Sequence, residues 1–261
     1  MDLGINHKVG LVFGAGSGLG RAMAVSIARE GVKVALAGRN LDTLNITKEI
    51  IEKNGGKAIA IKWDLADFSY IEKNFAAIEK ELGSVDILVN NTGGPPPTPA
   101  AGQSTTLWLE KFQEMVLSLI AITDRALPAM KEKKWGRILF STSSGAIAPI
   151  PNLAISNTLR ASLHAWSKTL AREVAAFGIT SNIIVPGRID TDRIRVLDEA
   201  NAKRQSKPIE EIVASSIKAI PMGRLGTPEE YGDTAAYLVS QPASYITGTI
   251  TRVDGGQLGT I

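Results

Sequence analysis

The stretch Val-Gly-Leu-Val-Phe-Gly-Ala-Gly-Ser-Gly-Leu-Gly, residues 9–20, decides the fold. It joins a short apolar run, Val9–Phe13, to a glycine-rich turn and then to a helical pattern from Leu19 to Glu30. A pyrophosphate can approach the backbone only where no Cβ intervenes, and a helix N-terminus offers unpaired N–H groups and a positive dipole end. The strand–turn–helix context therefore predicts a dinucleotide-binding loop rather than a purely structural turn, formed by Gly14, Ser17, Gly18, Leu19 and Gly20.

The rest of the chain alternates short apolar runs with amphipathic stretches. The predicted strands after the first lie at 33–37, 58–61, 85–89, 137–140, 180–185 and 249–253. The predicted helices after the first lie at 41–54, 71–82, 106–133, 153–177 and 228–240. Short apolar strands between helices indicate a parallel sheet covered on both faces. We therefore expect a single α/β domain over residues 1–261, a Rossmann-like doubly wound sheet of about seven strands.

Two segments interrupt this alternation. Thr92–Thr105 is rich in proline and glycine and leaves the carboxyl end of a predicted strand, where open α/β sheets bind ligands. It is interpreted as the rim of a site, with a stiff surface loop as the alternative. Arg188–Ala219 is charged and weakly periodic, which is compatible with a surface helix pair or with a mobile lid.

Composition narrows the classes of function. The 29 basic and 26 acidic residues give a formal charge of +3 without any block of like charge, which does not favour nucleic-acid binding. The chain has no cysteine, and His7 and His164 have no ligand-like neighbours, so we expect no metal. No apolar run has the ~18–20 residues of a membrane span, and no signal peptide is apparent. We expect a cytoplasmic protein that neither binds nor spans a membrane.

The end of the second predicted strand bears on the choice of cofactor. NAD binding favours an acidic side chain about 20 residues after the glycines, where it holds the ribose 2′-hydroxyl. No acidic residue lies between Lys33 and Leu41, and Gly38-Arg39 stands there instead. A guanidinium can pair with a 2′-phosphate. We therefore expect NADP(H), with NAD(H) as the alternative in which Arg39 is only a solvated loop cation.

Several motifs in order resemble the short-chain dehydrogenase/reductase family over essentially the whole chain, and its β-ketoacyl-[acyl-carrier-protein] reductase branch most. They are Gly14…Gly18…Gly20, spaced Gly-x-x-x-Gly-x-Gly, then Asp64-Leu65, Asn90-Asn91-Thr92-Gly93, Pro186-Gly187-Arg188-Ile189-Asp190-Thr191, Gly223-Arg224-Leu225-Gly226 and Val253-Asp254-Gly255-Gly256. The resemblance implies hydride transfer between a nicotinamide and a carbonyl or alcohol. It also implies cofactor contacts at Asp64, Leu65, Asn91, Gly93, Pro186, Gly187 and Ile189, and a homotetramer.

The resemblance implies partners as well. The substrate would be a small carbonyl compound or an acyl thioester, and an acyl carrier protein is a further candidate. Lys131, Lys133, Lys134 and Arg172 are candidates to receive an acidic carrier protein, with a solvated basic face as the alternative.

The catalytic positions depart from the family pattern of serine, tyrosine, lysine and asparagine. Ser143 matches the serine, but Ser156 and Arg160 stand where the resemblance places the tyrosine and the lysine. Met115 stands at the asparagine position. A serine hydroxyl is far less acidic than a phenol and lies nearer the backbone, and arginine is neither acid nor base near neutrality. None of the four tyrosines has the spacing of a substitute.

Three functions are compatible with these departures. In the first, the protein is a reductase whose proton arrives through Ser156 and water, or through Asp190. In the second, it binds NADP(H) as a sensor or partner subunit without catalysis. In the third, it performs different chemistry in the same pocket. Arg160 is interpreted as a cofactor contact rather than part of a generic salt bridge, while Ser156 could simply fill a helix surface and Ser143 could cap a loop.

Overall fold

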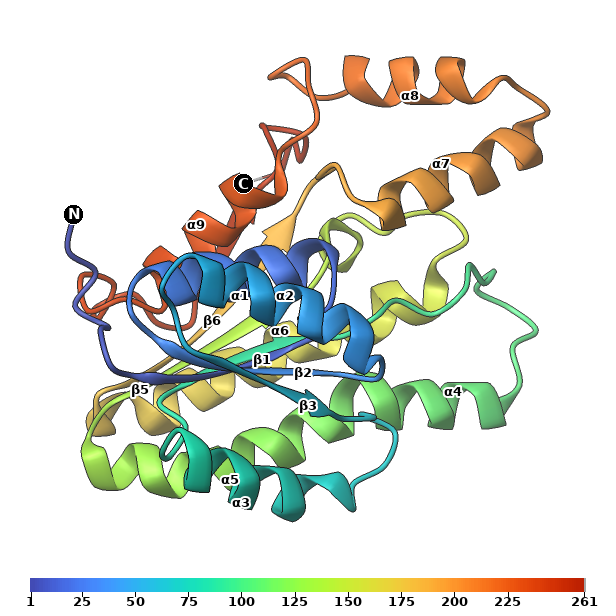
Figure 1. Ribbon diagram of the computed structural model, residues 1–261. Coiled ribbons are helices and arrows are strands. Elements are labelled where there is room, and N and C mark those ends of the chain that lie inside the picture. Colours follow the sequence, from blue (N-terminus) through green and yellow to red (C-terminus); the bar gives the residue numbers. More distant parts are fainter. Residues whose placement is uncertain (261) are drawn as a thin grey trace.

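The computed structural model describes residues 1–260 and has at its centre a seven-stranded parallel sheet of order β3-β2-β1-β4-β5-β6-β7 (Figure 1). The strands are β1 (Val9–Phe13), β2 (Lys33–Gly38), β3 (Ala58–Lys62), β4 (Ile87–Asn91), β5 (Gly136–Ser141), β6 (Ile179–Pro186) and β7 (Ile250–Val253). The order reverses between β3-β2-β1 and β4, which places a crevice at the carboxyl ends of β1 and β4. The predicted doubly wound fold is confirmed.

Helices cover both faces of the sheet, as the apolar runs require. They are α1 (Gly18–Arg29), α2 (Leu41–Lys53), α3 (Tyr70–Glu81), α4 (Thr105–Phe112), α5 (Ser118–Lys133), α6 (Ala154–Val174), α7 (Asp192–Gln205), α8 (Ile209–Lys218) and α9 (Pro228–Leu238). One buried cluster joins the sheet to α1, α2 and α9, and a second joins it to α3, α5 and α6. These helices lie on opposite sides of the sheet in Figure 1.

The helix predicted over 106–133 is interrupted, which is a correction to the sequence-based expectation. α4 and α5 are separated by a π-helical segment, Gln113–Leu117, that buries Met115 and Val116. A π-helical turn inserts a residue into the repeat and changes which side chains face the core. An average period of 3.6 residues does not detect such an insertion. The other predicted elements are present, with ends that differ by a few residues.

The segment after β6 stands apart from the rest of the molecule. α7 and α8 project away from the sheet and its covering helices in Figure 1. α7 is highly polar, and its buried side chains are only Asp198 and Ala202. The predicted helix pair is therefore confirmed, and α7 lies where it can cover the carboxyl ends of the strands. Its role as a mobile lid stays a prediction.

Candidate active site

A cavity of about 970 Å³ opens at the carboxyl ends of the central strands and beneath α7. All the residues predicted to contact the cofactor contribute to its wall, as do Ser143, Ser156 and Arg160. These residues are Gly14, Ser17, Gly18, Leu19, Gly20, Arg39, Asp64, Leu65, Asn91, Gly93, Ser143, Ser156, Arg160, Pro186, Gly187 and Ile189. Part of the proline-rich 92–105 segment also lines the cavity, as predicted for a rim.

The glycine loop has the shape that a pyrophosphate requires. A Cβ on Gly20 would lie 2.0 Å from the carbonyl oxygen of Gly14, and Gly18 has φ +50, so neither position accepts a larger residue without strain. Ser17 is the N-cap of α1, but its side chain makes no capping hydrogen bond. The first N–H groups of α1 are therefore open toward the cavity for an anionic ligand. Asn91 donates from Nδ2 to the Phe13 carbonyl oxygen at 3.2 Å and ties β4 to the loop.

The opposite wall of this end of the cavity carries the groups expected around an adenosine. Arg39 and Asp64 follow β2 and β3, the two strands between β1 and one edge of the sheet. The Asp64 carboxylate accepts a hydrogen bond from the Ala66 N–H at 3.0 Å, which orders the turn that it begins. Arg39 has an exposed side chain and makes no ion pair within residues 1–260. These residues fit a dinucleotide with its ribose phosphate near Arg39.

Arg160 is the most unusual group in the cavity wall. Its side chain is 6% exposed, yet its guanidinium faces backbone carbonyls and no carboxylate within residues 1–260. It donates to Ser141 at 3.3 Å, Thr92 at 3.0 Å and Gly93 at 3.4 Å, and so joins the ends of β4 and β5. Burial lowers the pKa of Arg160 to about 10, so it remains a cation at neutral pH. Cofactor contact at Arg160 stays a prediction.

Three residues with hydroxyl groups share the cavity wall with Arg160. Ser143 lines the cavity. Its Oγ also accepts a hydrogen bond from the Gly145 N–H at 3.1 Å, which is the loop-capping contact that the sequence left open as an alternative. Ser156 lies one helical turn before Arg160, is 9% exposed and makes no side-chain hydrogen bond to residues 1–260. The Oγ1 of Thr92 is buried without a partner in the same part of the chain. Two hydroxyls in the wall are thus free to contact a ligand.

The wall contains no tyrosine or lysine among the residues that the structure describes. Within residues 1–260, Tyr231 is the one tyrosine whose hydroxyl hydrogen-bonds to a wall residue: it lies 2.9 Å from the Ser141 Oγ, and it also donates to the Ile184 carbonyl oxygen at 3.2 Å. It is fully buried, and burial raises its pKa well above the ordinary value, so it is a poor proton donor. Met115 is 1% exposed in the core and does not reach the cavity.

Two further titratable groups have clear positions. Asp190 is exposed, is absent from the cavity wall and pairs with Arg195 at 3.3 Å, so nothing in this geometry supports a proton route through Asp190. His164 was not expected at the site, but its Nε2 lies 2.9 Å from the Oγ1 of Thr142, which lines the cavity. Burial lowers the pKa of His164. The sequence offered one signal for this position: His164 lies two helical turns after Ser156 and one after Arg160, and so on the same face of the helix.

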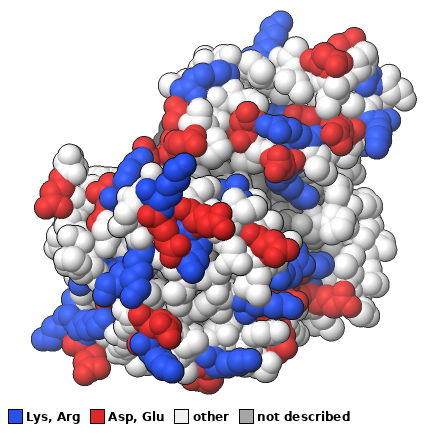
Figure 2. Space-filling model, viewed as in Figure 1, with Lys and Arg blue, Asp and Glu red and all other residues white. Residues whose placement is uncertain are grey.

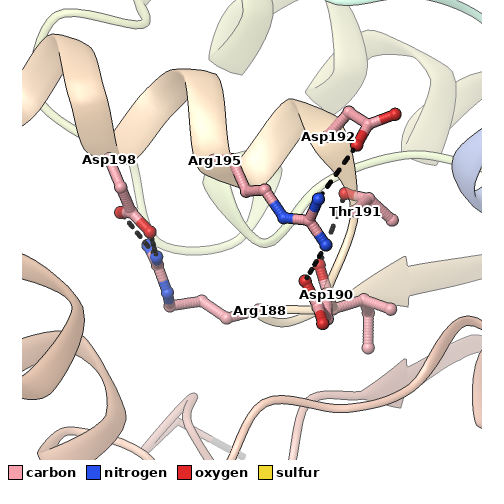
Figure 3. Close-up of polar contacts among 7 residues, drawn as sticks. Arg188, Asp190, Thr191, Asp192, Arg195 and Asp198 are labelled. Atoms are coloured by element: carbon pink, nitrogen blue, oxygen red, sulfur yellow. Dashed lines mark hydrogen bonds and ion pairs between the residues drawn. The ribbon is translucent and has the colours of Figure 1, made fainter.

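Ion pairs hold α7 over the cavity. Figure 3 shows Arg188, which follows Pro186-Gly187, donating to both carboxylate oxygens of Asp198 on α7, at 2.6 Å each. Both contacts come from one terminal nitrogen of Arg188, and the Arg188 Nε is buried without a partner, so this is a single charge-assisted contact and not a two-nitrogen fork. Arg193, in the first turn of α7, donates to the Pro95 carbonyl oxygen of the proline-rich rim at 3.2 Å. Sequence reasoning treated this segment as generally charged and missed the roles of these side chains.

Comparison with known proteins agrees with this geometry. Residues 14–257 match the family model described as "Enoyl-(Acyl carrier protein) reductase". The 3-oxoacyl-[acyl-carrier-protein] reductase FabG of Aquifex aeolicus (strain VF5) is 33% identical over 258 residues, which cover 98% of this chain and 99% of that protein. The chain belongs to the short-chain dehydrogenase/reductase family. The resemblance drawn from the motifs is therefore confirmed at the level of the family.

Two other members of the family are named with their cofactor. The NADPH-dependent reductase BacG of Bacillus subtilis (strain 168) is 31% identical over 262 residues, which cover 98% of this chain and all of that protein (100%). The structure of L-sorbose reductase from Gluconobacter frateurii, complexed with NADPH and L-sorbose, superposes with a TM-score of 0.93 at 29% identity, covering 100% of both chains. The chain is thus a member of a family of nicotinamide-dependent oxidoreductases with relatives that bind NADPH.

Two other findings concern ligands and membranes. No helix within residues 1–260 is long and apolar enough to cross a membrane. The same residues contain no group of three or more His, Cys, Asp or Glu side chains placed to hold a metal ion. Acidic and basic side chains are interspersed on the face shown in Figure 2.

Proposed function

We propose that this protein is an NADP(H)-dependent carbonyl reductase, similar in reaction to 3-oxoacyl-[acyl-carrier-protein] reductase, in which a serine and an arginine replace the family's tyrosine and lysine. The observation that carries the proposal is the cavity, whose wall combines the glycine loop, the rim and the polar group around Arg160. NADPH supplies the hydride when it is bound. The protein's own residues must then place the carbonyl, hold its developing negative charge and admit a proton.

Arg39 supports the choice of NADP(H) over NAD(H). It lies in the cavity wall just after β2, with Gly38 and Asn40 beside it and no acidic residue on that strand. A carboxylate at this position would repel a 2′-phosphate, whereas a guanidinium can donate two hydrogen bonds to it. We expect NADPH to bind more tightly than NADH, and Arg39→Asp to reverse that order.

Arg160 and the hydroxyls support a reaction without a phenol. A guanidinium that stays charged in a buried wall can stabilise the oxyanion that forms as the carbonyl is reduced. Ser143 and Ser156 can orient the carbonyl oxygen and a water molecule that delivers the proton. Neither group is a general acid near neutrality, so turnover is expected to be slower than with a tyrosine, by about 10²–10⁴. Such a loss still leaves measurable catalysis.

A fluorescence titration with NADPH and with NADH, followed by addition of an acetoacetyl thioester, tests the proposal. Tight NADPH binding followed by steady oxidation is the expected result. Absence of binding by either nucleotide would overturn the cofactor assignment. Tight binding without oxidation by any carbonyl in a broader panel would instead support the alternative function, a nucleotide-binding sensor or partner subunit with lost or altered catalysis.

The same proposal includes assembly as a homotetramer through α5, α6 and the C-terminal region. Apolar side chains are exposed there without a covering element, including Leu117 at 40%, Phe177 at 39%, Tyr245 at 100% and Ile250 at 45%. Light scattering coupled to gel filtration should give a mass near four chains. An acyl carrier protein stays a candidate partner, although Lys133 already pairs with Asp86 at 2.6 Å.

A further inference from the structure

The charged groups in the cavity wall are unequally paired. Three of the acidic side chains there have a cationic partner: Asp198 pairs with Arg188 at 2.6 Å, Glu114 with Lys111 at 2.7 Å, and Asp192 with Arg195 at 3.4 Å, an arginine that also pairs with Asp190. The remaining acid, Asp64, follows β3 near the adenosine end. The part of the cavity beneath α7 therefore presents no free carboxylate within residues 1–260.

Besides Arg39 at the adenosine end, three arginines in the wall have no acidic partner among the same residues. Arg160 donates only to carbonyls, Arg193 donates to the Pro95 carbonyl at 3.2 Å, and Arg204 donates to the Asn201 side-chain oxygen at 2.6 Å. Arg193 is close enough to Arg160 that its positive charge further lowers the pKa that burial has already reduced. A guanidinium has five N–H donors, and most of those on Arg193 have no acceptor. This end of the cavity therefore carries uncompensated positive charge.

The two exposed cations belong to one face of α7. Arg193, Leu197, Asn201 and Arg204 all line the cavity, and their spacing of four, four and three residues brings them to the same side of the helix. The ion pairs in Figure 3 set this rotation, because Asp198 is held by Arg188 while Arg195 turns outward to Asp190 and Asp192. The cationic face is therefore aimed at the ligand space by the fold.

A buried hydroxyl adds an independent polar group to the same space. Thr92 is 7% exposed, lines the cavity, and its Oγ1 has no hydrogen-bond partner. Its own carbonyl accepts from Arg160, so the hydroxyl belongs to the neighbourhood of the buried guanidinium. A buried hydroxyl without a partner costs free energy unless a ligand or water satisfies it. The wall therefore favours a ligand with polar atoms that can hydrogen-bond to this hydroxyl.

We infer that Arg193 and Arg204 form an anion-binding subsite beneath α7, which takes the carboxylate of a carbonyl substrate while the reacting carbonyl lies near Ser156 and Arg160. A guanidinium fork matches the two oxygens of a carboxylate, whereas the neutral chain of an acyl thioester would leave these charges unpaired. The inference rests on the proposed reductase function and narrows it, because the substrate is then an oxo-carboxylate.

Binding measured by calorimetry tests the subsite without requiring turnover. The probes are a series of linear oxo-carboxylates of increasing chain length, each compared with its neutral methyl ester, on the protein with and without NADP⁺. We expect at least one carboxylate to bind more tightly than its ester by about tenfold or more. Arg193→Met and Arg204→Met should each remove most of that difference and leave ester binding unchanged. The preference should also weaken as salt is raised.

Arg195→Met is the matched control, since Arg195 lies on the same helix but is itself absent from the cavity wall, and its contacts with Asp190 and Asp192 join exposed side chains. It should keep the full preference for the carboxylate. Equal binding of every carboxylate and its ester by the unmodified protein would overturn the inference, as would an equal loss in Arg195→Met. NADPH affinity should stay within about twofold in all three variants. Its loss in Arg193→Met in parallel with carboxylate binding would assign that guanidinium to the cofactor's pyrophosphate and also overturn the inference.

The same experiment separates the two proposals. A clear carboxylate preference in a protein that reduces no carbonyl would overturn the reductase function and leave the subsite in place. Reduction of neutral ketones with no advantage for their carboxylate analogues would do the opposite.

Discussion

Two buried arginines lie at opposite ends of β5 and have no carboxylate partner within residues 1–260, yet we assign them different roles. Arg137, at the amino end, is 1% exposed and donates to the carbonyl oxygens of Ser240, Gly136 and Gly178 at 3.1, 2.9 and 3.2 Å. It also stacks over Trp135 at 4.4 Å. Arg160, at the carboxyl end, is 6% exposed and has three carbonyl acceptors too. Burial lowers the pKa of each to about 10.

Their surroundings distinguish them. Arg137 is enclosed by packed chain and is absent from the wall of the cavity, whereas Arg160 shares that wall with a second guanidinium, Arg193. An arginine that is merely buried and bonded to carbonyls, such as Arg137, therefore has a structural role. Only the open space and the uncompensated charge around Arg160 indicate a ligand.

The largest expected effect comes from restoring the family's tyrosine and lysine near the carboxyl end of β5. Ser156→Tyr with Arg160→Lys should raise the rate of ketone reduction by about 10²–10⁴, because a phenol beside an ammonium is an efficient proton donor. Steady-state oxidation of NADPH measures this change, with Arg160→Lys alone as the control. No gain in a folded double variant that still binds NADPH would show that the pocket has diverged beyond these two positions.

The next largest effect is on stability and concerns Arg137, at the amino end of β5. Arg137→Met should lower the free energy of unfolding by about 3 kcal/mol, because three buried carbonyl oxygens lose a charged donor that water cannot readily replace. The NADPH dissociation constant of the folded fraction should not change. Urea unfolding and nucleotide titration on the same preparation measure the two quantities. Weakened NADPH binding with unchanged stability would contradict the structural role.

The matching change at the carboxyl end should show the reverse pattern. Arg160→Met should cost about 1 kcal/mol of stability, since water in the cavity can replace the guanidinium at the carbonyls. It should nevertheless abolish most of the reductase rate, because the buried cation near the carbonyl is lost. Arg160→Lys should recover part of the rate. A variant as active as the original protein would remove Arg160 from the mechanism.

The smallest effect concerns pH. Burial lowers the pKa of His164 below its ordinary value of 6.5, so the unfolded chain takes up this proton more readily than the folded one. Stability from this group is complete above about pH 6.5 and is lost as the pH falls through the folded-state pKa. His164→Gln keeps a group able to hydrogen-bond to Thr142 and should flatten the fall in thermal midpoint on acidification. An unchanged slope would contradict this assignment.

Much of the fold could be predicted because its signals are local. The glycine loop, the apolar strands and the two catalytic-position departures each depend on a few adjacent residues, and the structure brings Ser143, Ser156 and Arg160 to one cavity as expected. The π-helical segment at 113–117 could not be predicted, since one inserted residue barely changes a hydrophobic period. Pairings such as Arg188 with Asp198, or Arg160 beside Arg193, depend on how helices lie over the sheet, which periodicity does not specify.

The most direct test of the central claim is a single-turnover experiment on the protein with NADPH bound, mixed with a panel of ketones and oxo-carboxylates while nicotinamide absorbance is followed. We predict that the absorbance falls in the unmodified protein, that it falls unchanged in folded Arg137→Met, and that it falls far more slowly in Arg160→Met. An NADPH complex that stays fully reduced with every carbonyl in the panel would contradict the account and leave a nucleotide-binding protein without reductase activity.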